Sequence, residues 1–269
     1  MSLAEAAVLG VVQGLTEFLP ISSTAHLRVV PALFGWTDPG AAYSAVIQLG
    51  SVLAVLTYFR SDIFRIASGA LKAIQEKDFE AQDFRIAGAI VVGTLPVCVL
   101  GLLLKKYIEG PLRELIVVGI ASIVMGCLLL LAEKLAKHVR GIETISGKDG
   151  FLVGCGQAMA LIPGCSRSGS TLTVAMFLNM KREDAARFSF LLGIPALILS
   201  GLLELKDMIS EGMSNAAAVD LVVGLVVSTV VSYAAIAWFI KYLRNHSTLV
   251  FVAYRILFGI GVIYMSMKK

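Results

Sequence analysis

The stretches Gln13-GLTEFLPISSTA-His26 and Pro163-GCSRSGS-Thr171 decide how this chain folds, because each places charged and hydroxyl side chains inside an otherwise apolar sequence. Glu17, His26 and Arg167 would be costly in hydrocarbon without partners. A proline also interrupts each stretch, so neither suits a continuous helix. We therefore interpret both stretches as candidate functional sites and not as plain membrane spans.

The composition defines the class of protein. The chain has 269 residues, of which 57% are hydrophobic and 16% charged, and its mean hydropathy is +0.84. A soluble domain is much less apolar, so the sequence predicts an all-α integral membrane protein. Six segments are long enough to cross a bilayer. These segments are Ala41–Phe59, Ile86–Leu104, Leu115–Ala132, Phe188–Leu203, Leu221–Ile240 and about Ser247–Met267.

The two broken stretches are too short to be further spans. Only residues 6–16 are free of charge before Glu17 and Pro20 intervene, and no basic region or cleavage signal marks a removable signal peptide. Residues 150–180 have Pro163 and Arg167 in the middle of an apolar segment. Both stretches are predicted to form re-entrant helix pairs.

The chain also contains an internal repeat. Gln13 and Gln157 each open a short apolar segment that ends at a proline, Pro20 or Pro163, and a serine-rich turn follows. The glutamines are 144 residues apart and the prolines 143. Each turn is followed by three spans. We interpret the chain as one membrane domain over 1–269, with repeat 1 at about 1–135 and repeat 2 at about 150–269.

The repeat predicts an inverted topology. Three spans per copy is an odd number, so the second copy enters the membrane from the opposite side. The tips of the re-entrant pairs would then meet near the midplane. Lys and Arg concentrate in loops 60–85, 134–148, 181–187 and 241–244, which the positive-inside rule places in the cytoplasm. Both termini are predicted to be periplasmic, and segment 63–82 to be a cytoplasmic connector whose charges lie in water.

The first broken stretch combines an acid with a helix N-terminus. Gln13 and Glu17 are four residues apart, so they share one face of the first short helix. Pro20 ends that helix, and the following hydroxyls cap a second one whose first turn carries His26. A helix N-terminus favours an anion. The predicted capping hydroxyls belong to Ser22, Ser23 and Thr24.

The second stretch repeats this arrangement with different side chains. Pro163 and Gly164 break the helix, and Arg167 follows as an intramembrane cation. Arginine binds phosphate oxygens in a planar fork and stays charged when it is desolvated. The two opposed N-termini therefore predict an oxyanion site. Its second half consists of Ser166, Arg167, Ser168 and Thr171.

Simpler roles compete with a functional one for single residues. A membrane Ser or Thr often bonds only to the carbonyl four residues earlier, and His26 could be an interior histidine. The coincidence of acid, histidine, arginine and hydroxyls at two helix breaks favours function. Segment 164–171 lacks the lysine of a P-loop, and Cys165 is too close to Arg167 for a cysteine-dependent phosphatase.

Two further features are given structural interpretations. Arg255 is a lone cation in the last span, and we expect its side chain to snorkel toward the cytoplasmic end. The four cysteines show no metal-ligand spacing, and we expect them to be small buried hydrophobes. They are Cys98, Cys127, Cys155 and Cys165.

Both stretches resemble the signature motifs of the bacterial undecaprenyl-diphosphate phosphatase family, which is also the bacitracin resistance family. The resemblance covers essentially the whole chain. Its first position is Glu or Gln in the family and Gln13 here, so a mechanism with two carboxylates on that helix is not supported. The matching residues are Gln13-x3-Glu17, Pro20-Ile21-Ser22-Ser23-Thr24-x-His26 and Pro163-Gly164-x-Ser166-Arg167-Ser168-x2-Thr171.

The resemblance implies an enzyme of the bacterial inner membrane that hydrolyses undecaprenyl diphosphate to undecaprenyl phosphate and inorganic phosphate. This reaction recycles the lipid carrier for peptidoglycan synthesis, and the site would open to the periplasm. A divalent cation, Mg2+ or Ca2+, is implied at Glu17, with Gln13 as a second candidate ligand. Ser23, His26 and an activated water stay open as the nucleophile. The implied catalytic residues are Glu17, Ser23, His26 and Arg167, and the implied phosphate contacts are Ser22, Thr24, Ser166, Arg167, Ser168 and Thr171.

A transporter or flippase for a polyprenyl phosphate or another anion is the alternative function, since inverted repeats with facing re-entrant loops are common in transporters. The expected partners are a polyprenyl diphosphate lipid and membrane lipid. The net charge of +4 comes from loops and gives no reason to expect nucleic acid. Gly119 and Gly126 permit close helix contacts and a homodimer.

Overall fold

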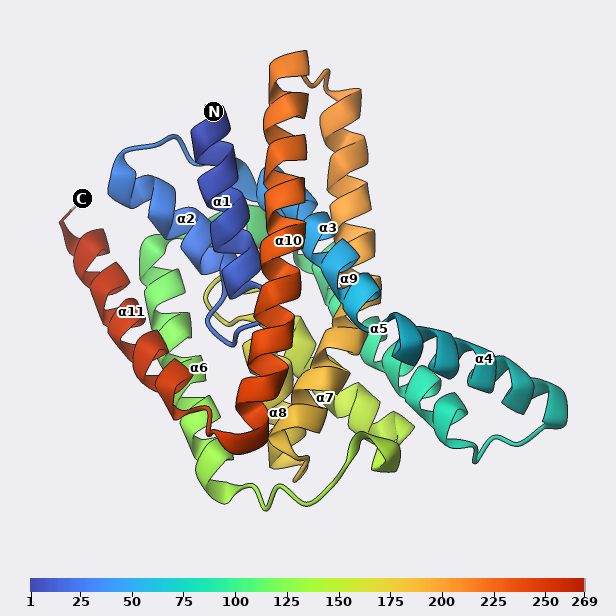
Figure 1. Cartoon of the computed structure of the whole chain (residues 1–269). Helices are drawn as coiled ribbons and strands as arrows, with labels where there is room; N and C mark the ends of the chain where they lie inside the picture. Colours follow the sequence, from blue (N-terminus) through green and yellow to red (C-terminus); the bar gives the residue numbers. More distant parts are fainter. Residues whose placement is uncertain (269) are drawn as a thin grey trace.

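The fold is a bundle of helices, shown in Figure 1 as a computed structural model that describes residues 1–268 apart from the side chain of Glu109. Within this range the only strand-like feature is an isolated bridge between Arg140 and Met180. The helices in chain order are α1 (Leu3–Thr16), α2 (Ser23–Phe34), α3 (Gly40–Tyr58), α4 (Arg60–Glu76), α5 (Gln82–Glu109), η1 (Pro111–Arg113), α6 (Leu115–Leu135), η2 (Ile142–Thr144), α7 (Gly147–Met159), α8 (Arg167–Phe177), α9 (Arg182–Ser210), α10 (Asn215–Asn245) and α11 (Leu249–Met267).

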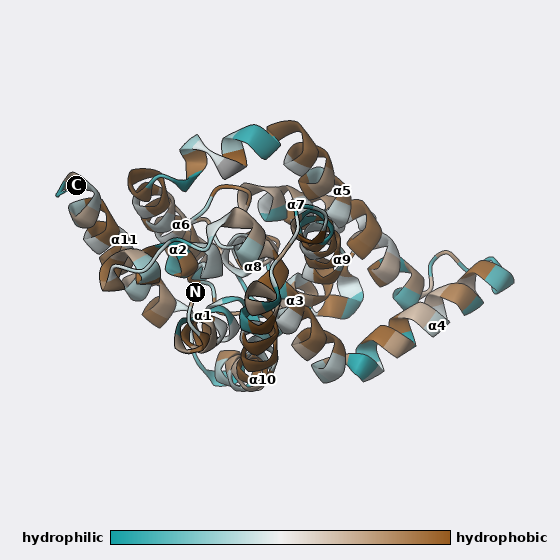
Figure 2. Cartoon of the chain, turned by 90° about the horizontal axis from the view of Figure 1, so that it is seen from above, coloured by the Kyte–Doolittle hydropathy of each residue, from teal (hydrophilic) through white to brown (hydrophobic). Residues whose placement is uncertain are grey.

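Six of these helices, α3, α5, α6, α9, α10 and α11, are long and apolar enough to cross a membrane. This confirms the six predicted spans. Pro96 and Pro195 lie inside α5 and α9 without ending them, which neighbouring helices make tolerable in a membrane protein. Apolar side chains such as Val91, Leu95 and Val226 are exposed on the outer faces, and the ribbon of α5 and α10 is largely brown in Figure 2. The bundle therefore presents an apolar surface to its surroundings.

The two halves begin in the same way. α1 and α7 each start with a capping box, formed by Ser2 with Glu5 and by Ser146 with Asp149. Such a box satisfies backbone N–H groups that a helix start leaves free. Each helix then ends before a proline, and a turn leads into a second short helix, α2 or α8. These short pairs are what the sequence predicted at both breaks. Whether they are re-entrant in a membrane stays a prediction.

The packing of the halves is also reciprocal. α1 lies along α10 and α7 along α5, while α3 packs on α9 and α6 on α11. Glycines allow the first two contacts: a Cβ added at Gly10 would lie 2.8 Å from the Gly224 carbonyl oxygen, and one at Gly154 2.2 Å from that of Gly93. Gly10 and Gly154 are 144 residues apart, the same separation as Gln13 and Gln157. This pattern supports an inverted repeat, which stays an interpretation.

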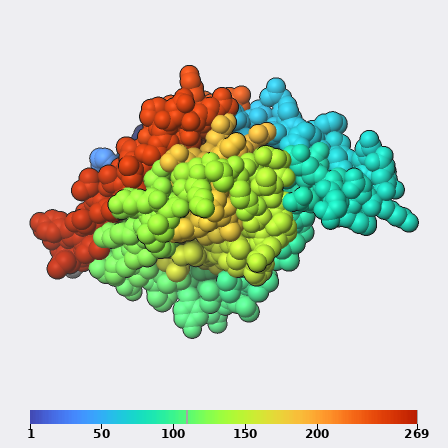
Figure 3. All heavy atoms as spheres, turned by 90° about the horizontal axis from the view of Figure 1, so that it is seen from below, coloured from blue at the N-terminus to red at the C-terminus, as the bar shows by residue number. Residues whose placement is uncertain are grey.

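α4 has no counterpart in the second half. Together with the start of α5 it projects from the side of the molecule, as Figure 3 shows. Its charges are not all solvated, because Asp62 pairs with Arg187 of α9 and Arg65 pairs with Asp83 of α5. Phe64 is exposed on the same helix. Of the four paired residues only Arg65 lies in the predicted connector 63–82, and its side chain is 44% exposed although it forms an ion pair.

Two sequence expectations about small residues need correction. Cys165 is buried and Cys98 half-buried, but Cys127 and Cys155 are exposed. The prediction of four buried cysteines fails because the outer face of a membrane bundle is also apolar. Gly119 and Gly126 contact α11 of the same chain, since a Cβ would lie 2.6 Å from Ile263 at the first and 3.3 Å from Arg255 at the second. These glycines serve internal packing and give no support for a dimer.

Candidate functional site

Two serine N-caps shape the turns between the short helices. Ser22 has φ 76° and Ser166 has φ 70°, a region that L-residues rarely adopt and that is strained by about 1–2 kcal/mol. The Ser22 hydroxyl accepts the Ala25 N–H at 3.4 Å, and the Ser166 hydroxyl accepts the Gly169 N–H at 3.0 Å. Strain of this kind clusters at functional sites. Of the three hydroxyls predicted to cap α2, only that of Ser22 is the N-cap.

The two turns are in direct contact. The Gly164 N–H donates to the Ser22 hydroxyl at 3.3 Å. The Ser168 hydroxyl donates to the carbonyls of Glu17 at 3.0 Å and Leu19 at 2.9 Å. Motifs separated by just over half the chain therefore form one unit. Ser168, which was predicted to touch phosphate, joins the two turns in this structure.

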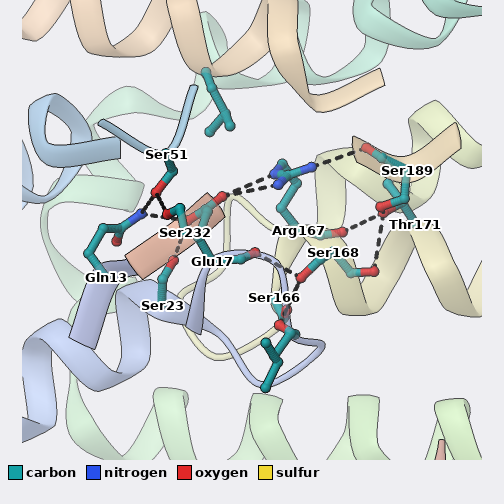
Figure 4. A network of polar contacts seen from close by, with 12 residues as sticks. Gln13, Glu17, Ser23, Ser51, Ser166, Arg167, Ser168, Thr171, Ser189 and Ser232 are labelled. Carbon is teal, nitrogen blue, oxygen red and sulfur yellow. Dashed lines mark hydrogen bonds and ion pairs between the residues drawn. The ribbon is translucent and has the colours of Figure 1, made fainter. Parts of the chain in front are cut away.

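Glu17 lies at the centre of the unit and is only 4% exposed. Its Oε1 accepts hydrogen bonds from Nε and Nη2 of Arg167, both at 3.2 Å. Its Oε2 accepts the Ser23 hydroxyl at 2.6 Å and the Gln13 amide at 2.9 Å. Figure 4 shows these side chains converging from α1, α2 and α8. A buried carboxylate needs a paired cation and further donors, and Glu17 has both.

Arg167 is held on its other side by α9. Its Nη1 donates to the Ser189 carbonyl at 3.1 Å, and its guanidinium carbon lies 5.9 Å from the Phe18 ring centroid. The Thr171 hydroxyl donates to the Arg167 carbonyl at 2.7 Å and lies 2.5 Å from the Ser189 hydroxyl. Thr171 therefore supports the first turn of α8. Ser189 is a residue of this site that the sequence analysis did not single out.

A chain of buried hydroxyls extends the site behind Gln13. The Gln13 Nε2 donates to Ser51 of α3 at 3.2 Å, and Ser51 contacts Ser228 at 3.2 Å and Ser232 at 2.9 Å. These three serines are fully buried. The Gln13 Oε1 is also buried and has no hydrogen-bond partner in the part of the chain that the structure describes. None of these serines was predicted from sequence, although Ser228 and Ser232 are four residues apart in an apolar span and gave a visible signal.

His26 faces a different part of the molecule. Its Nδ1 lies 2.7 Å from the Ser22 carbonyl, so Nδ1 carries the proton of this bond. Its Nε2 lies 2.6 Å from the Tyr254 hydroxyl, and its ring stacks on Phe258 with centroids 4.4 Å apart. Neither ring nitrogen bonds to Glu17. The Thr24 hydroxyl contacts that of Ser22 at 3.2 Å and is likewise outside the Glu17 group.

Arg255 does not snorkel. It is 1% exposed, and its guanidinium donates to the carbonyls of Pro20 at 2.8 Å and Gly164 at 2.7 Å. It also donates to the carbonyls of Cys165 at 3.0 Å and Ser122 at 3.2 Å. The expectation from sequence is wrong, because the carbonyls of Pro20, Gly164 and Cys165 at the helix breaks need donors that water supplies elsewhere.

The arrangement combines the elements of phosphoryl chemistry. A serine hydroxyl hydrogen-bonded to a carboxylate is the geometry of a nucleophile beside its base. Arg167 and the free N–H groups of two helix starts can stabilise negative charge on phosphoryl oxygens. Because the surroundings exclude water, each of these interactions is stronger than on a surface. The fold and site define a multi-pass membrane protein with a buried group of Glu17, Ser23 and Arg167 at two helix starts.

The comparisons with known proteins agree with this class. The sequence model of the family described as "Bacitracin resistance protein BacA" matches residues 6–261. The chain belongs to this family. It is 58% identical over 258 residues to a protein of Gloeobacter violaceus named undecaprenyl-diphosphatase, covering 95% of this chain and 89% of that protein. Proteins with the same name from Trichormus variabilis and Myxococcus xanthus are 52% identical over 267 residues and 54% identical over 261 residues, with 98% and 97% of this chain and 83% and 88% of theirs covered.

Proposed function

We propose that this protein hydrolyses undecaprenyl diphosphate to undecaprenyl phosphate and inorganic phosphate and so returns the carrier lipid to peptidoglycan synthesis. The observation that carries the proposal is the buried meeting of Glu17, Ser23 and Arg167 across the two turns. Full-length relatives named for this reaction support it. They favour hydrolysis over the transporter alternative.

The chemistry follows from the contacts of Glu17. An attacking oxygen, that of Ser23 or of a water in its place, gives its proton to the Glu17 carboxylate as it bonds to the terminal phosphorus. The bond from that phosphorus to the bridging oxygen breaks, and undecaprenyl phosphate leaves. With Ser23 as the attacking group, a water then releases inorganic phosphate from the serine. The geometry favours Ser23 over His26 as the partner of Glu17.

Arg167 is the proposed anchor for the phosphoryl oxygens. In the structure its Nε and Nη2 are bonded to Glu17, so a bound phosphate would take over part of these bonds. The hydrogen bond from Nη1 to the Ser189 carbonyl would keep the guanidinium in place while phosphate replaces Glu17 as its partner. Charge on the phosphoryl group grows toward the leaving oxygen, where a fixed cation stabilises it.

A divalent cation fits the residues present. The unpartnered Gln13 Oε1 and the Glu17 carboxylate are oxygen donors of the kind that Mg2+ and Ca2+ bind. Among residues 1–268, no group of three or more His, Cys, Asp or Glu could hold a metal alone. The cation would thus be shared with the substrate phosphates, which is usual for Mg2+. When bound, it would neutralise charge on the diphosphate.

The orientation is part of the proposal. The basic loops between helices support a cytoplasmic placement of that end of the bundle. Figure 1 shows α1 beginning and α11 ending toward the opposite end. The site would then open to the periplasm, with the prenyl tail of the substrate among the apolar outer faces.

The test is phosphate release by the purified protein in detergent, with undecaprenyl diphosphate and Mg2+ or Ca2+. The chain should release phosphate, and Glu17→Ala and Arg167→Ala should not. Glu183→Ala and Arg244→Ala are matched controls, because these residues form an exposed ion pair of the same chemical type. The proposal fails if the unaltered chain is inactive, or if activity survives in both site variants.

A further inference from the structure

One guanidinium joins equivalent points of the two turns. Arg255 donates through Nη1 to the Pro20 carbonyl and through Nη2 to the Gly164 carbonyl. Pro20 and Gly164 are 144 residues apart, and each lies two residues before the strained serine N-cap of its turn. The last helix therefore contacts both turns at matching positions.

The surroundings of Arg255 leave it without a counter-charge. All its hydrogen bonds go to backbone carbonyls, and in residues 1–268 no carboxylate forms a salt bridge with it. A buried cation is unfavourable unless something compensates for its charge. An anionic substrate bound in front of the turns would do so. The charge balance of the site is therefore more favourable with a diphosphate bound.

Neighbouring glycines leave room for this side chain. A Cβ at Gly169, in the first turn of α8, would lie 2.7 Å from Nη1 of Arg255 and 3.1 Å from the Ser166 hydroxyl. A Cβ at Gly126 of α6 would lie 3.3 Å from the Cβ of Arg255. The guanidinium therefore fits tightly between the N-terminus of α8 and α6, and a small change there displaces it.

We propose that Arg255 is a positioning residue for the reaction. It draws the carbonyls of Pro20, Gly164 and Cys165 away from the phosphate-binding face, so that the N–H groups of both helix starts and Arg167 converge on one anion. Its uncompensated charge adds to the attraction for the diphosphate. This inference rests on the proposed function.

The variants Arg255→Lys and Arg255→Gln separate the positioning of the two turns from the effect of the positive charge. Lysine keeps the charge but has one nitrogen in place of the planar fork, so we expect kcat to fall at least about tenfold while KM changes less than about threefold. Glutamine keeps donors but not the charge, and KM should then rise as well. Arg182→Lys is the matched control, because Arg182 is a partly buried arginine that pairs with Glu133 away from the turns.

The measurements are kcat and KM per folded molecule, with the folded fraction taken from gel filtration and thermal unfolding. The Arg182 control should lower Tm and leave kcat per folded molecule unchanged. An Arg255→Lys protein with native kcat would overturn the proposal, whatever its Tm. If the unaltered chain itself released no phosphate, the proposed function would have failed instead.

A second variant, Gly169→Ala, disturbs the position of the Arg255 guanidinium without replacing Arg255. Gly169→Ala meets the flexible end of Arg255, so the fold can tolerate it by moving the guanidinium. We expect kcat to fall in the native background and to change less than about twofold in the Arg255→Lys background. Equal losses in both backgrounds would show that Gly169 acts independently of Arg255 and would count against the proposal. Gly261→Ala, which has open space around it, is the control.

Discussion

The turn at residues 17–26 and the turn at residues 163–171 have the same backbone and opposite chemistry. Both contain a serine N-cap with positive φ, and both begin a short helix. The first carries the carboxylate Glu17 and the second carries the cation Arg167. The two turns therefore share the geometry of their helix starts and differ in the charged side chain that each contributes to the Glu17–Arg167 pair.

The largest effect should come from the hydroxyl on Glu17. Ser23→Ala removes the group 2.6 Å from Oε2, and we expect kcat to fall about 1,000-fold if this hydroxyl is the nucleophile. Thr24→Ala, its neighbour with a hydroxyl bonded only to Ser22, should lose less than about tenfold. Phosphate release with a radiolabelled lipid measures both. Equal losses of kcat in the two variants would show that Ser23 is not the nucleophile and would favour water as the attacking group.

The next largest loss of kcat is expected at Gln13, and Gln157, at the equivalent position of the second half, is the comparison. Gln13 bonds to Glu17 and Ser51, whereas the side-chain oxygen and nitrogen of Gln157 are buried without a hydrogen-bond partner among the described residues 1–268. Gln13→Leu should lower kcat about 10–100-fold, from the loss of hydrogen bonds of about 1–3 kcal/mol. Gln157→Leu should leave kcat unchanged and raise or maintain Tm, because it removes an unsatisfied buried group. A loss of activity in Gln157→Leu would show that the second half has an unrecognised part in the site.

The dependence of activity on a divalent cation should also differ between variants of Gln13 and variants of Gln157. Chelation should abolish phosphate release, and added Mg2+ or Ca2+ should restore it. In Gln13→Ala the cation concentration for half-maximal activity should rise about tenfold, because one oxygen ligand is lost. In Gln157→Ala it should not change. Activity that is indifferent to chelation would contradict the proposed cation site.

A smaller effect is expected at Tyr254. Its hydroxyl fixes Nε2 of His26, and Tyr254→Phe removes this bond while it keeps the stacked ring. We expect kcat to fall about 3–10-fold, as for one neutral hydrogen bond. Tyr264→Phe, an exposed tyrosine on the same helix, is the control. If Tyr254→Phe has native kcat, His26 needs no orientation from α11.

The smallest effect on catalysis concerns the capping boxes. Burial alone would raise the pKa of Asp149, but hydrogen bonds from Arg140 and Ser146 and the Arg140 charge outweigh burial and lower it. A carboxyl with a lowered folded-state pKa adds stability above its unfolded pKa of about 3.9 and loses it as the pH falls through the folded value. Asp149→Asn should therefore lower Tm at pH 7, with a difference that shrinks below about pH 4. Glu5→Gln, in the box without an arginine, should show a smaller difference at pH 7, and kcat should be native in both.

The sequence predicted the spans and the meeting of the two motifs for clear physical reasons. Long apolar runs predicted spans, and Pro20 and Pro163, next to charged and serine-rich residues, predicted the ends of helices. From sequence Glu17 and Arg167 were expected in facing turns, and their direct contact was found in the structure. Residue type and position at the two helix breaks were therefore enough to predict that an acid and a cation lie close together.

The remaining parts depended on packing that no local pattern specifies. Arg255 was misplaced because its partners are backbone carbonyls from three distant segments, which have no side-chain signature. Ser189 and Ser51 were missed because serines in spans usually bond back to their own helix. His26 was grouped with Glu17 because both belong to one motif, but the first turn of α2 directs its ring toward α11.

The central claim is that Glu17 and Arg167, from separate turns, act as one unit. A double-mutant cycle with Glu17→Gln, Arg167→Lys and the double variant tests it most directly, with kcat/KM for phosphate release as the measurement. The account predicts that the double variant is within about threefold of the more impaired single variant, as for residues that act together. Losses that multiply would contradict it, because the two turns would then contribute independently.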